Sequence, residues 1–167
     1  MAYWRLYYHV VWSTKRRDPW IVEDLPALVE NAMRHRLHAL DVLIHGVGIM
    51  PDHVHLALSI PPHRSIAEVV GQGKGAASFL IRQQYADPDD ETSFTWQAGY
   101  GVFSLSEKAL PGVLSYLANQ KTHHETGDLW PGLERVDPPE NERTVREVET
   151  GYESNPGERS DPPGPTR

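Results

Sequence analysis

The chain contains no cysteine, which excludes disulfide bonds and thiolate zinc sites. No uninterrupted apolar run approaches the ~20 residues that a membrane-spanning helix needs, so we expect no membrane association. The chain also does not open with a basic segment followed by an apolar one, as a secretory signal would. These absences predict a soluble, cytoplasmic protein.

The composition predicts one folded domain with an appendage. Hydrophobic residues make up 39% of the 167 residues, which is enough for a sizeable core. The net charge of −7 is unevenly divided, because residues 1–136 hold 12 basic and 15 acidic side chains whereas residues 137–167 hold 4 and 8. The latter segment also has 6 of the 14 prolines. We therefore predict a folded domain at 1–136 and an acidic, proline-rich, disordered tail at 137–167.

The hydrophobic pattern predicts the order strand, helix, strand, strand, helix, strand, helix. Period-2 alternation marks the strands, and apolar residues at helical spacing mark the helices. Strands are expected at 3–13, 42–49, 53–60 and 94–105, and helices at 24–40, 65–85 and 106–124. This order is the split pattern of a ferredoxin-like or RRM-like α+β domain, a four-stranded antiparallel sheet with packed helices.

Three glycines, Gly71, Gly73 and Gly75, lie in the first half of the second predicted helix. Glycine weakens a helix by about 1 kcal/mol relative to alanine, and such residues often mark a close approach of another group. The segment around Lys74 lacks the spacing of a phosphate-binding P-loop and the serine or threonine after the lysine, which excludes an ATPase of that type.

Two histidines share one face of the strand at 53–60. His53 and His55 are two residues apart, so both imidazoles point the same way. Two neutral imidazoles on a rigid strand can chelate one divalent ion. The alternative is a pair of surface histidines without a ligand.

The last predicted helix carries a second pair. Tyr116 and Gln120 are spaced i and i+4 beside the apolar stripe of this helix, so they can contact one ligand jointly. The alternative is a boundary tyrosine with a packed ring and a hydrated hydroxyl.

Four segments resemble, in order, the signature segments of a known family. They are His9-Val10-Val11-Trp12-Ser13-Thr14-Lys15-Arg16-Arg17, Met50-Pro51-Asp52-His53-Val54-His55-Leu56, Trp96-Gln97-Ala98-Gly99-Tyr100 and Tyr116-Leu117-Ala118-Asn119-Gln120. Together they are similar to the single-tyrosine HUH transposases of the insertion-sequence 200 type, including the REP-associated and domesticated relatives. The resemblance covers about residues 3 to 125.

The resemblance implies roles for individual residues. His53 and His55 would be the metal ligands, Gln120 the third ligand and Tyr116 the nucleophile, with Mg²⁺ or Mn²⁺ as the cofactor. It also implies a homodimer that cuts and rejoins single-stranded DNA with hairpin ends through a 5′-phosphotyrosine intermediate. In some relatives the tyrosine helix serves the histidines of the partner chain, so Tyr116 could act in either chain.

Basic residues supply candidate phosphate contacts. The adjacent Lys15, Arg16 and Arg17, together with Lys74 in the second helix, are the residues we expect to bind DNA. The alternative for each of them is an ordinary solvated surface charge.

Two other functions compete with the transposase interpretation. The first is a non-catalytic RRM-like module that binds single-stranded nucleic acid, and the second is a protein with a structural metal. The presence of His53, His55, Tyr116 and Gln120 in their family segments favours the enzyme. The sequence leaves open whether the chain is a mobile-element transposase or a domesticated relative.

Overall fold

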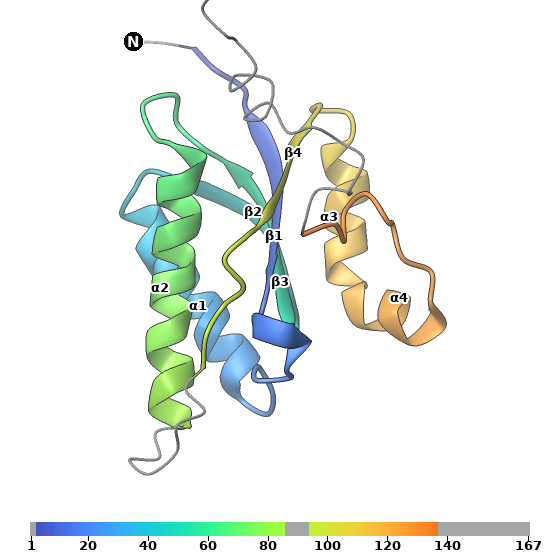
Figure 1. Ribbon diagram of the computed structural model, residues 1–167. Coiled ribbons are helices and arrows are strands. Elements are labelled where there is room, and N and C mark those ends of the chain that lie inside the picture. Colours follow the sequence, from blue (N-terminus) through green and yellow to red (C-terminus); the bar gives the residue numbers. More distant parts are fainter. Residues whose placement is uncertain (1–2, 86–93, 137–167) are drawn as a thin grey trace, which may run out of the picture. The chain divides into compact units, whose positions relative to one another are not determined.

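The computed structural model describes residues 3–85 and 94–136 (Figure 1). The predicted disordered tail at 137–167 lies outside the described residues. Within the described ranges, no helix is long and apolar enough to cross a membrane.

Four antiparallel strands form one sheet. They are β1 (Tyr7–Ser13), β2 (Leu43–Met50), β3 (His53–Ser59) and β4 (Gly101–Leu105), in the order β2-β3-β1-β4. This order confirms the ferredoxin-like α+β prediction, with β1 and β3 at the centre. The first strand begins at Tyr7 and is therefore shorter than the predicted strand at 3–13.

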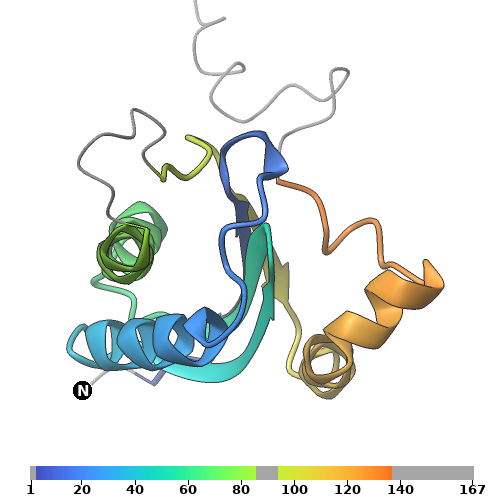
Figure 2. The same cartoon turned by 90° about the horizontal axis from the view of Figure 1, so that it is seen from below.

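Helices cover both faces of the sheet. Helices α1 (Leu25–His38) and α2 (Ile66–Gln84) pack on one face, whereas α3 (Leu110–Ala118) and α4 (Gln120–Thr126) lie on the other (Figure 2). A short 3-10 turn, η1 (Lys15–Arg17), follows β1. The sheet is therefore the middle layer, and each of its faces can serve a different purpose.

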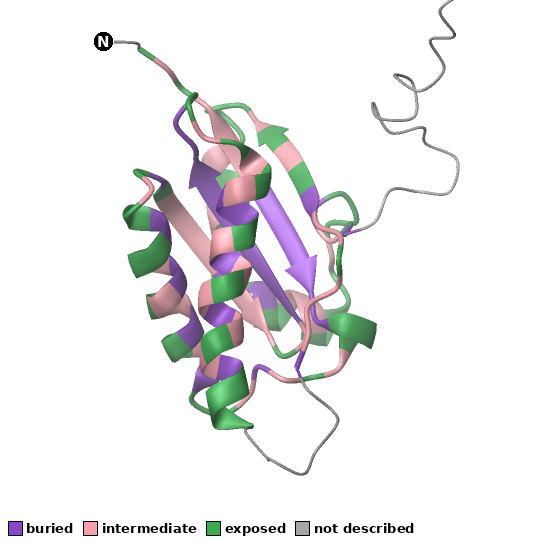
Figure 3. Cartoon of the chain, turned by 60° about the vertical axis from the view of Figure 1, so that its left-hand side comes forward, coloured by how far each residue is buried: buried purple, intermediate pink, exposed green. Residues whose placement is uncertain are grey.

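The main core lies between the sheet and the α1/α2 layer. All seven residues of β3 are buried, and Figure 3 colours the buried residues purple. The alternation of this strand sends Val54, Leu56 and Leu58 into this core beside Trp12 of β1. The opposite face of β3 carries Ala57, which packs in a smaller apolar cluster with residues of α3. The histidines of β3 share this second face.

One of the three glycines of α2 marks a close approach. A Cβ atom at Gly73 would lie 3.3 Å from the Trp12 ring, so the glycine lets α2 pack tightly against β1. Gly71 and Gly75 have no atom within 4 Å of a hypothetical Cβ. The expectation of a close contact therefore holds for Gly73 alone.

The prediction of a continuous strand over 94–105 is wrong. Strand β4 begins only at Gly101, and Trp96 forms an isolated bridge with Thr14. Between these two points, the carbonyl groups of Gln97 and Gly99 accept hydrogen bonds from the Lys74 ammonium, at 2.8 and 2.9 Å. A helix side chain thus occupies acceptors that a strand partner would otherwise use.

The prediction of one helix over 106–124 is also wrong. Helix α3 ends at Ala118, and α4 begins at Gln120 in a different direction (Figures 1 and 2). Asn119 separates them, with φ −105° and ψ 16°, and its Nδ2 donates to the carbonyl oxygen of Ser115 at 2.9 Å. The backbone N–H of Asn119 bonds to the same oxygen at 3.2 Å, so the side chain adds a second donor where the helix ends.

The segment after α4 should depend on the small size of Gly101. A Cβ atom there would overlap the carbonyl oxygen of Arg135 and lie 2.9 Å from Cγ1 of Val11. We expect Gly101→Ala to reduce the free energy of unfolding by about 1–3 kcal/mol, as overpacking does. Urea unfolding measures this, with Gly71→Ala as the control, which should leave stability unchanged or raise it by up to about 1 kcal/mol. Equal stability of Gly101→Ala and the wild type would contradict the packing.

Candidate active site

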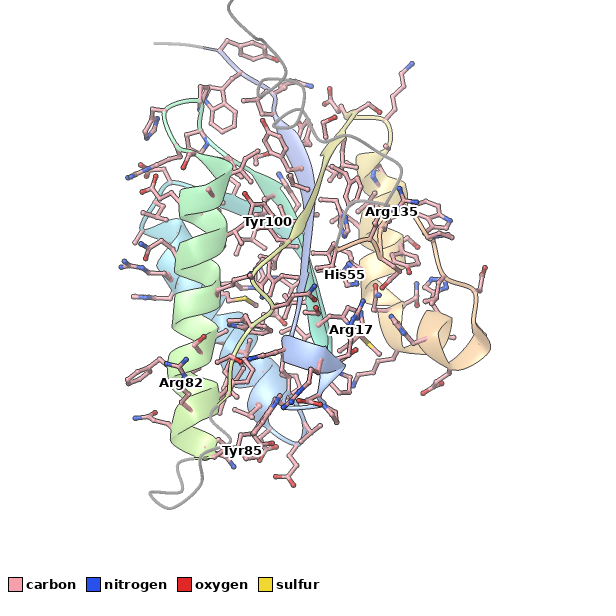
Figure 4. All side chains as sticks on the ribbon, in the orientation of Figure 1. Arg17, His55, Arg82, Tyr85, Tyr100 and Arg135 are labelled. Carbon is pink, nitrogen blue, oxygen red and sulfur yellow. The ribbon has the colours of Figure 1, made fainter. Side chains whose placement is uncertain are left out.

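The two histidines of β3 lie inside the protein. Because residues two apart on a strand share a face, His53 and His55 both point toward the α3/α4 layer. Their exposed fractions are 1% and 0%, so they are not surface histidines. Figure 4, which labels His55, shows it between the sheet and this helical layer.

Two further residues join the histidines. His124 comes from α4, and Glu134 comes from the irregular segment that follows α4. One ligand atom from each of these four residues lies within 4.8 Å of the others. The Glu134 Oε2 atom is 3.4 Å from the Nε2 atoms of both His53 and His55 and 3.6 Å from that of His124. Three imidazoles and one carboxylate therefore converge on one point.

His53 is oriented by the residue before it. Its Nδ1–H donates to Oδ1 of Asp52 at 2.5 Å, and a carboxylate can only accept. The Nε2 atom therefore carries the lone pair in the neutral ring. This Nε2 atom is buried and makes no hydrogen bond within the described residues. Asp52 is held in turn by Nη1 of Arg17 at 3.2 Å.

His55 is oriented by His9 on the neighbouring strand β1. The His55 Nδ1 and His9 Nε2 atoms are 3.0 Å apart, and burial together with the nearby His55 lowers the pKa of His9 to about 3. The amide nitrogen of Gln120, which can only donate, lies 3.1 Å from Nε2 of His55. His55 therefore accepts at Nε2 and donates from Nδ1 to a neutral His9. Such outer partners fix the tautomer of metal-binding histidines.

Gln120 occupies the centre of the cluster. Its Nε2 atom lies 3.1 Å from Nε2 of His124 and donates to Oε1 of Glu134 at 2.8 Å. Its Oε1 atom, the one that can bind a cation, is buried without a hydrogen-bond partner in the described part of the chain.

Tyr116 contacts the carboxylate that faces the histidines of its own chain. Its side chain is in the smaller apolar cluster and is 4% exposed. The hydroxyl donates to Oε1 of Glu134 at 2.6 Å and accepts from the backbone N–H of Trp130 at 3.3 Å. The ring stacks on His123 and on Trp130, with centroids 4.7 and 5.5 Å away. Burial, with the Glu134 carboxylate, raises the pKa of Tyr116 to about 12.

The contacts within the cluster shift the pKa values of its members in different directions. Burial alone would raise the pKa of Glu134, but its contacts with His53, His55 and Tyr116 outweigh burial and hold that pKa far below its usual range. Burial alone would lower the pKa of His53, but Asp52 and Glu134 raise it above its ordinary value. Burial lowers the pKa values of His55 and His124. A cation bound at this point would therefore compete with a proton for Nε2 of His53. The Glu134 carboxylate, which is ionised, would be available to it as a ligand.

The donor set fits a divalent metal. Imidazole nitrogens and carboxylate oxygens are ordinary ligands of divalent cations, and the unpartnered Nε2 of His53 is aimed at the point where they meet. The group of His53, His55, His124 and Glu134 can therefore hold a metal ion.

The predicted DNA contacts divide between two places. The exposed turn η1 consists of Lys15, Arg16 and Arg17. Two contacts with Asp52 connect it to the site: the Arg17 side chain pairs with the carboxylate, and the Thr14 N–H donates to the carbonyl oxygen at 2.8 Å. Lys74 lies on α2, on the opposite face of the sheet. Burial lowers its pKa, and its ammonium is bonded to carbonyl oxygens of residues 97–99.

Two residues of the cluster were not predicted. His124 follows Gln120 by one helical turn, and this spacing could have indicated it. Glu134 had no comparable signal, because it lies in an irregular segment without periodicity.

Comparisons with known proteins identify the family and agree with the fold. The family model described as "Transposase IS200 like" matches residues 2–120. The ISDra2 transposase TnpA of Deinococcus radiodurans is 25% identical over 119 residues, which cover 70% of this chain and 85% of that protein. The transposase for insertion sequence element IS200 of Salmonella typhimurium is 24% identical over 127 residues, covering 75% and 83%.

Solved structures show the same fold. A putative transposase from Deinococcus radiodurans R1 superposes with a TM-score of 0.56 at 25% identity, covering 72% of this chain and 95% of that one. A REP-associated tyrosine transposase, solved bound to a REP hairpin, gives a TM-score of 0.55 at 13% identity, covering 78% and 81%. The match over residues 2–120 shows that the chain belongs to the IS200-like transposase family, whose function is DNA transposition.

Proposed function

We propose that the chain cuts and rejoins single-stranded DNA through a covalent 5′-phosphotyrosine. One observation carries the proposal: a single carboxylate, Glu134, connects the Tyr116 hydroxyl to the buried pair His53 and His55. A nucleophile and a cation-binding cluster then act on the same phosphate.

The proposed cleavage is a transesterification. The phenolic oxygen of Tyr116 forms a bond to phosphorus, the bond from phosphorus to the 3′ oxygen breaks, and the 3′ oxygen takes up a proton as the tyrosine loses its own. The number of phosphoester bonds does not change, so the reverse reaction can rejoin strands without a nucleotide cofactor.

We propose that His53, His55, His124 and Glu134 hold a divalent cation, Mg²⁺ or Mn²⁺, with Gln120 as the further ligand predicted from the sequence. Bound there, the cation would polarise the scissile phosphate and offset the charge that develops in the transition state. Asp52 and His9 orient the two histidines, and the helical layer of α3 and α4 excludes water from them.

The proposed substrate is single-stranded DNA beside a hairpin. A relative of the same fold was solved with a REP hairpin, and the exposed turn η1 presents Lys15 and Arg16 next to the cluster. The homodimer expected from the resemblance stays a proposal. Within one chain, the Tyr116 hydroxyl contacts Oε1 of Glu134, and the two histidines face Oε2 of the same carboxylate.

A non-catalytic RRM-like module is disfavoured by the second helical layer. Such modules stack bases on an open sheet face, and here the face that carries His55 and Ala57 is buried under α3 and α4.

Tyr116→Phe should abolish covalent adduct formation and leave DNA binding intact, because the substitution removes only the attacking oxygen. The measurement incubates the protein with labelled single-stranded DNA from the flanks of its own gene, with Mn²⁺ or Mg²⁺, and analyses it on a denaturing gel. The wild type should form a metal-dependent adduct that resists denaturation. A wild type that binds this DNA and forms no adduct would contradict the enzyme and favour a binding module.

The basic turn should contribute phosphate contacts. The double variant Lys15→Ala/Arg16→Ala should weaken binding to single-stranded DNA. A plot of the logarithm of the binding constant against the logarithm of the salt concentration should become less steep, by about 0.7 in slope per lost phosphate contact. The control Arg36→Ala removes a basic side chain on α1 that is bonded to Gln72, and it should leave the slope unchanged. Identical slopes for all three proteins would exclude the turn as a DNA contact.

A further inference from the structure

Glu134 divides its two carboxylate oxygens between the nucleophile and the histidines. Its Oε1 atom accepts from the Tyr116 hydroxyl at 2.6 Å, whereas its Oε2 atom faces the imidazoles of His53 and His55 at 3.4 Å. Glu134 also lies beyond the residues 2–120 that the family model matches. No role for it follows from membership of the family.

At the nucleophile, Glu134 fixes the direction of the hydroxyl hydrogen. A phenolic oxygen has one hydrogen and two lone pairs. The hydrogen points to Glu134, and the backbone N–H of Trp130 uses one lone pair at 3.3 Å. The remaining lone pair is the one that can attack, so its direction is set before a substrate arrives.

At the histidines, Glu134 supplies the anionic ligand. It is the one acidic residue in the candidate metal group of the described residues, and its Oε2 faces all three imidazoles. Gln120 donates to the other oxygen at 2.8 Å, which limits rotation of the carboxylate.

The backbone around Glu134 is anchored on both sides. Leu133 is buried with Ala57 and Leu117, and Val136 is buried as well. The N–H groups of Leu133 and Glu134 donate to the carbonyl oxygen of Trp130 at 2.8 and 3.2 Å. The carboxylate is therefore held in place by packing and backbone hydrogen bonds, as a functional group must be.

We propose that Glu134 joins the nucleophile to the metal centre, with Oε1 orienting the Tyr116 hydroxyl and Oε2 serving as a metal ligand. The part that concerns Tyr116 rests on the proposed transesterase function, and the part that concerns the metal rests on the proposed cation site, which a metal titration tests without DNA.

The test compares Glu134→Ala and Glu134→Gln with the wild type and with Glu125→Ala, a control that removes an exposed carboxylate from α4. Calorimetric titration with Mn²⁺ alone measures metal affinity, and circular dichroism checks folding. Single-turnover reactions at saturating Mn²⁺ and DNA measure adduct formation. The glutamine variant keeps the side-chain volume, so it separates loss of charge from loss of packing.

We expect Glu134→Ala to lower Mn²⁺ affinity by about 10-fold or more and the adduct rate by about 100-fold, with DNA affinity retained. Glu134→Gln should show the same loss of Mn²⁺ affinity, and Glu125→Ala should match the wild type. Unchanged Mn²⁺ affinity in both Glu134 variants would overturn the proposal. An unchanged or faster adduct rate in Glu134→Ala would overturn the link to Tyr116.

A wild type without any adduct would instead refute the proposed function and the Tyr116 half of the inference with it. The Mn²⁺ titration would still decide whether Glu134 is a ligand.

Discussion

The alternation of side chains along β3 is the constraint on which the site depends. The same strand sends Leu56 into the main core and His55 to the opposite face, so the core fixes where the imidazoles point. A shift of the strand by one residue would exchange the two faces and bury histidines among apolar side chains. The register with β1, in which Val11 opposes His55 and Trp12 opposes Val54, therefore secures fold and site together.

The buried cluster could hold a metal ion. Imidazoles and a carboxylate removed from water need partners, because an unpaired buried polar group costs free energy. The outer partners Asp52 and His9 satisfy the far nitrogens of His53 and His55, which leaves the Nε2 atoms to face Glu134. Strands β1 and β3, helix α4 and the irregular segment that carries Glu134 must meet for this arrangement. The site therefore forms only in the folded chain.

Local patterns in the sequence predicted most of the fold and half of the cluster. The predicted alternation placed His53 and His55 on one face of a strand, and both lie on strand β3 in the structure. The break at Asn119 could not be predicted from the apolar stripe, because its features are a non-helical backbone and a side-chain hydrogen bond, and neither leaves a hydrophobic pattern. Glu134 could not be predicted either, since its position depends on long-range packing of Leu133 against α3 and the sheet. The proposed roles of Tyr116 and Gln120 as nucleophile and ligand stay predictions.

Complementation between two inactive variants tests most directly whether one chain holds the complete site. Tyr116→Phe and His53→Ala chains, co-expressed with different tags and purified together, would be assayed for the covalent DNA adduct. Because Tyr116 contacts the same carboxylate that faces the histidines of its own chain, we predict no adduct from the mixed protein and a clear adduct from co-expressed wild-type chains. Recovery of the adduct on the His53→Ala chain would show that the tyrosine serves a partner, and it would contradict the account.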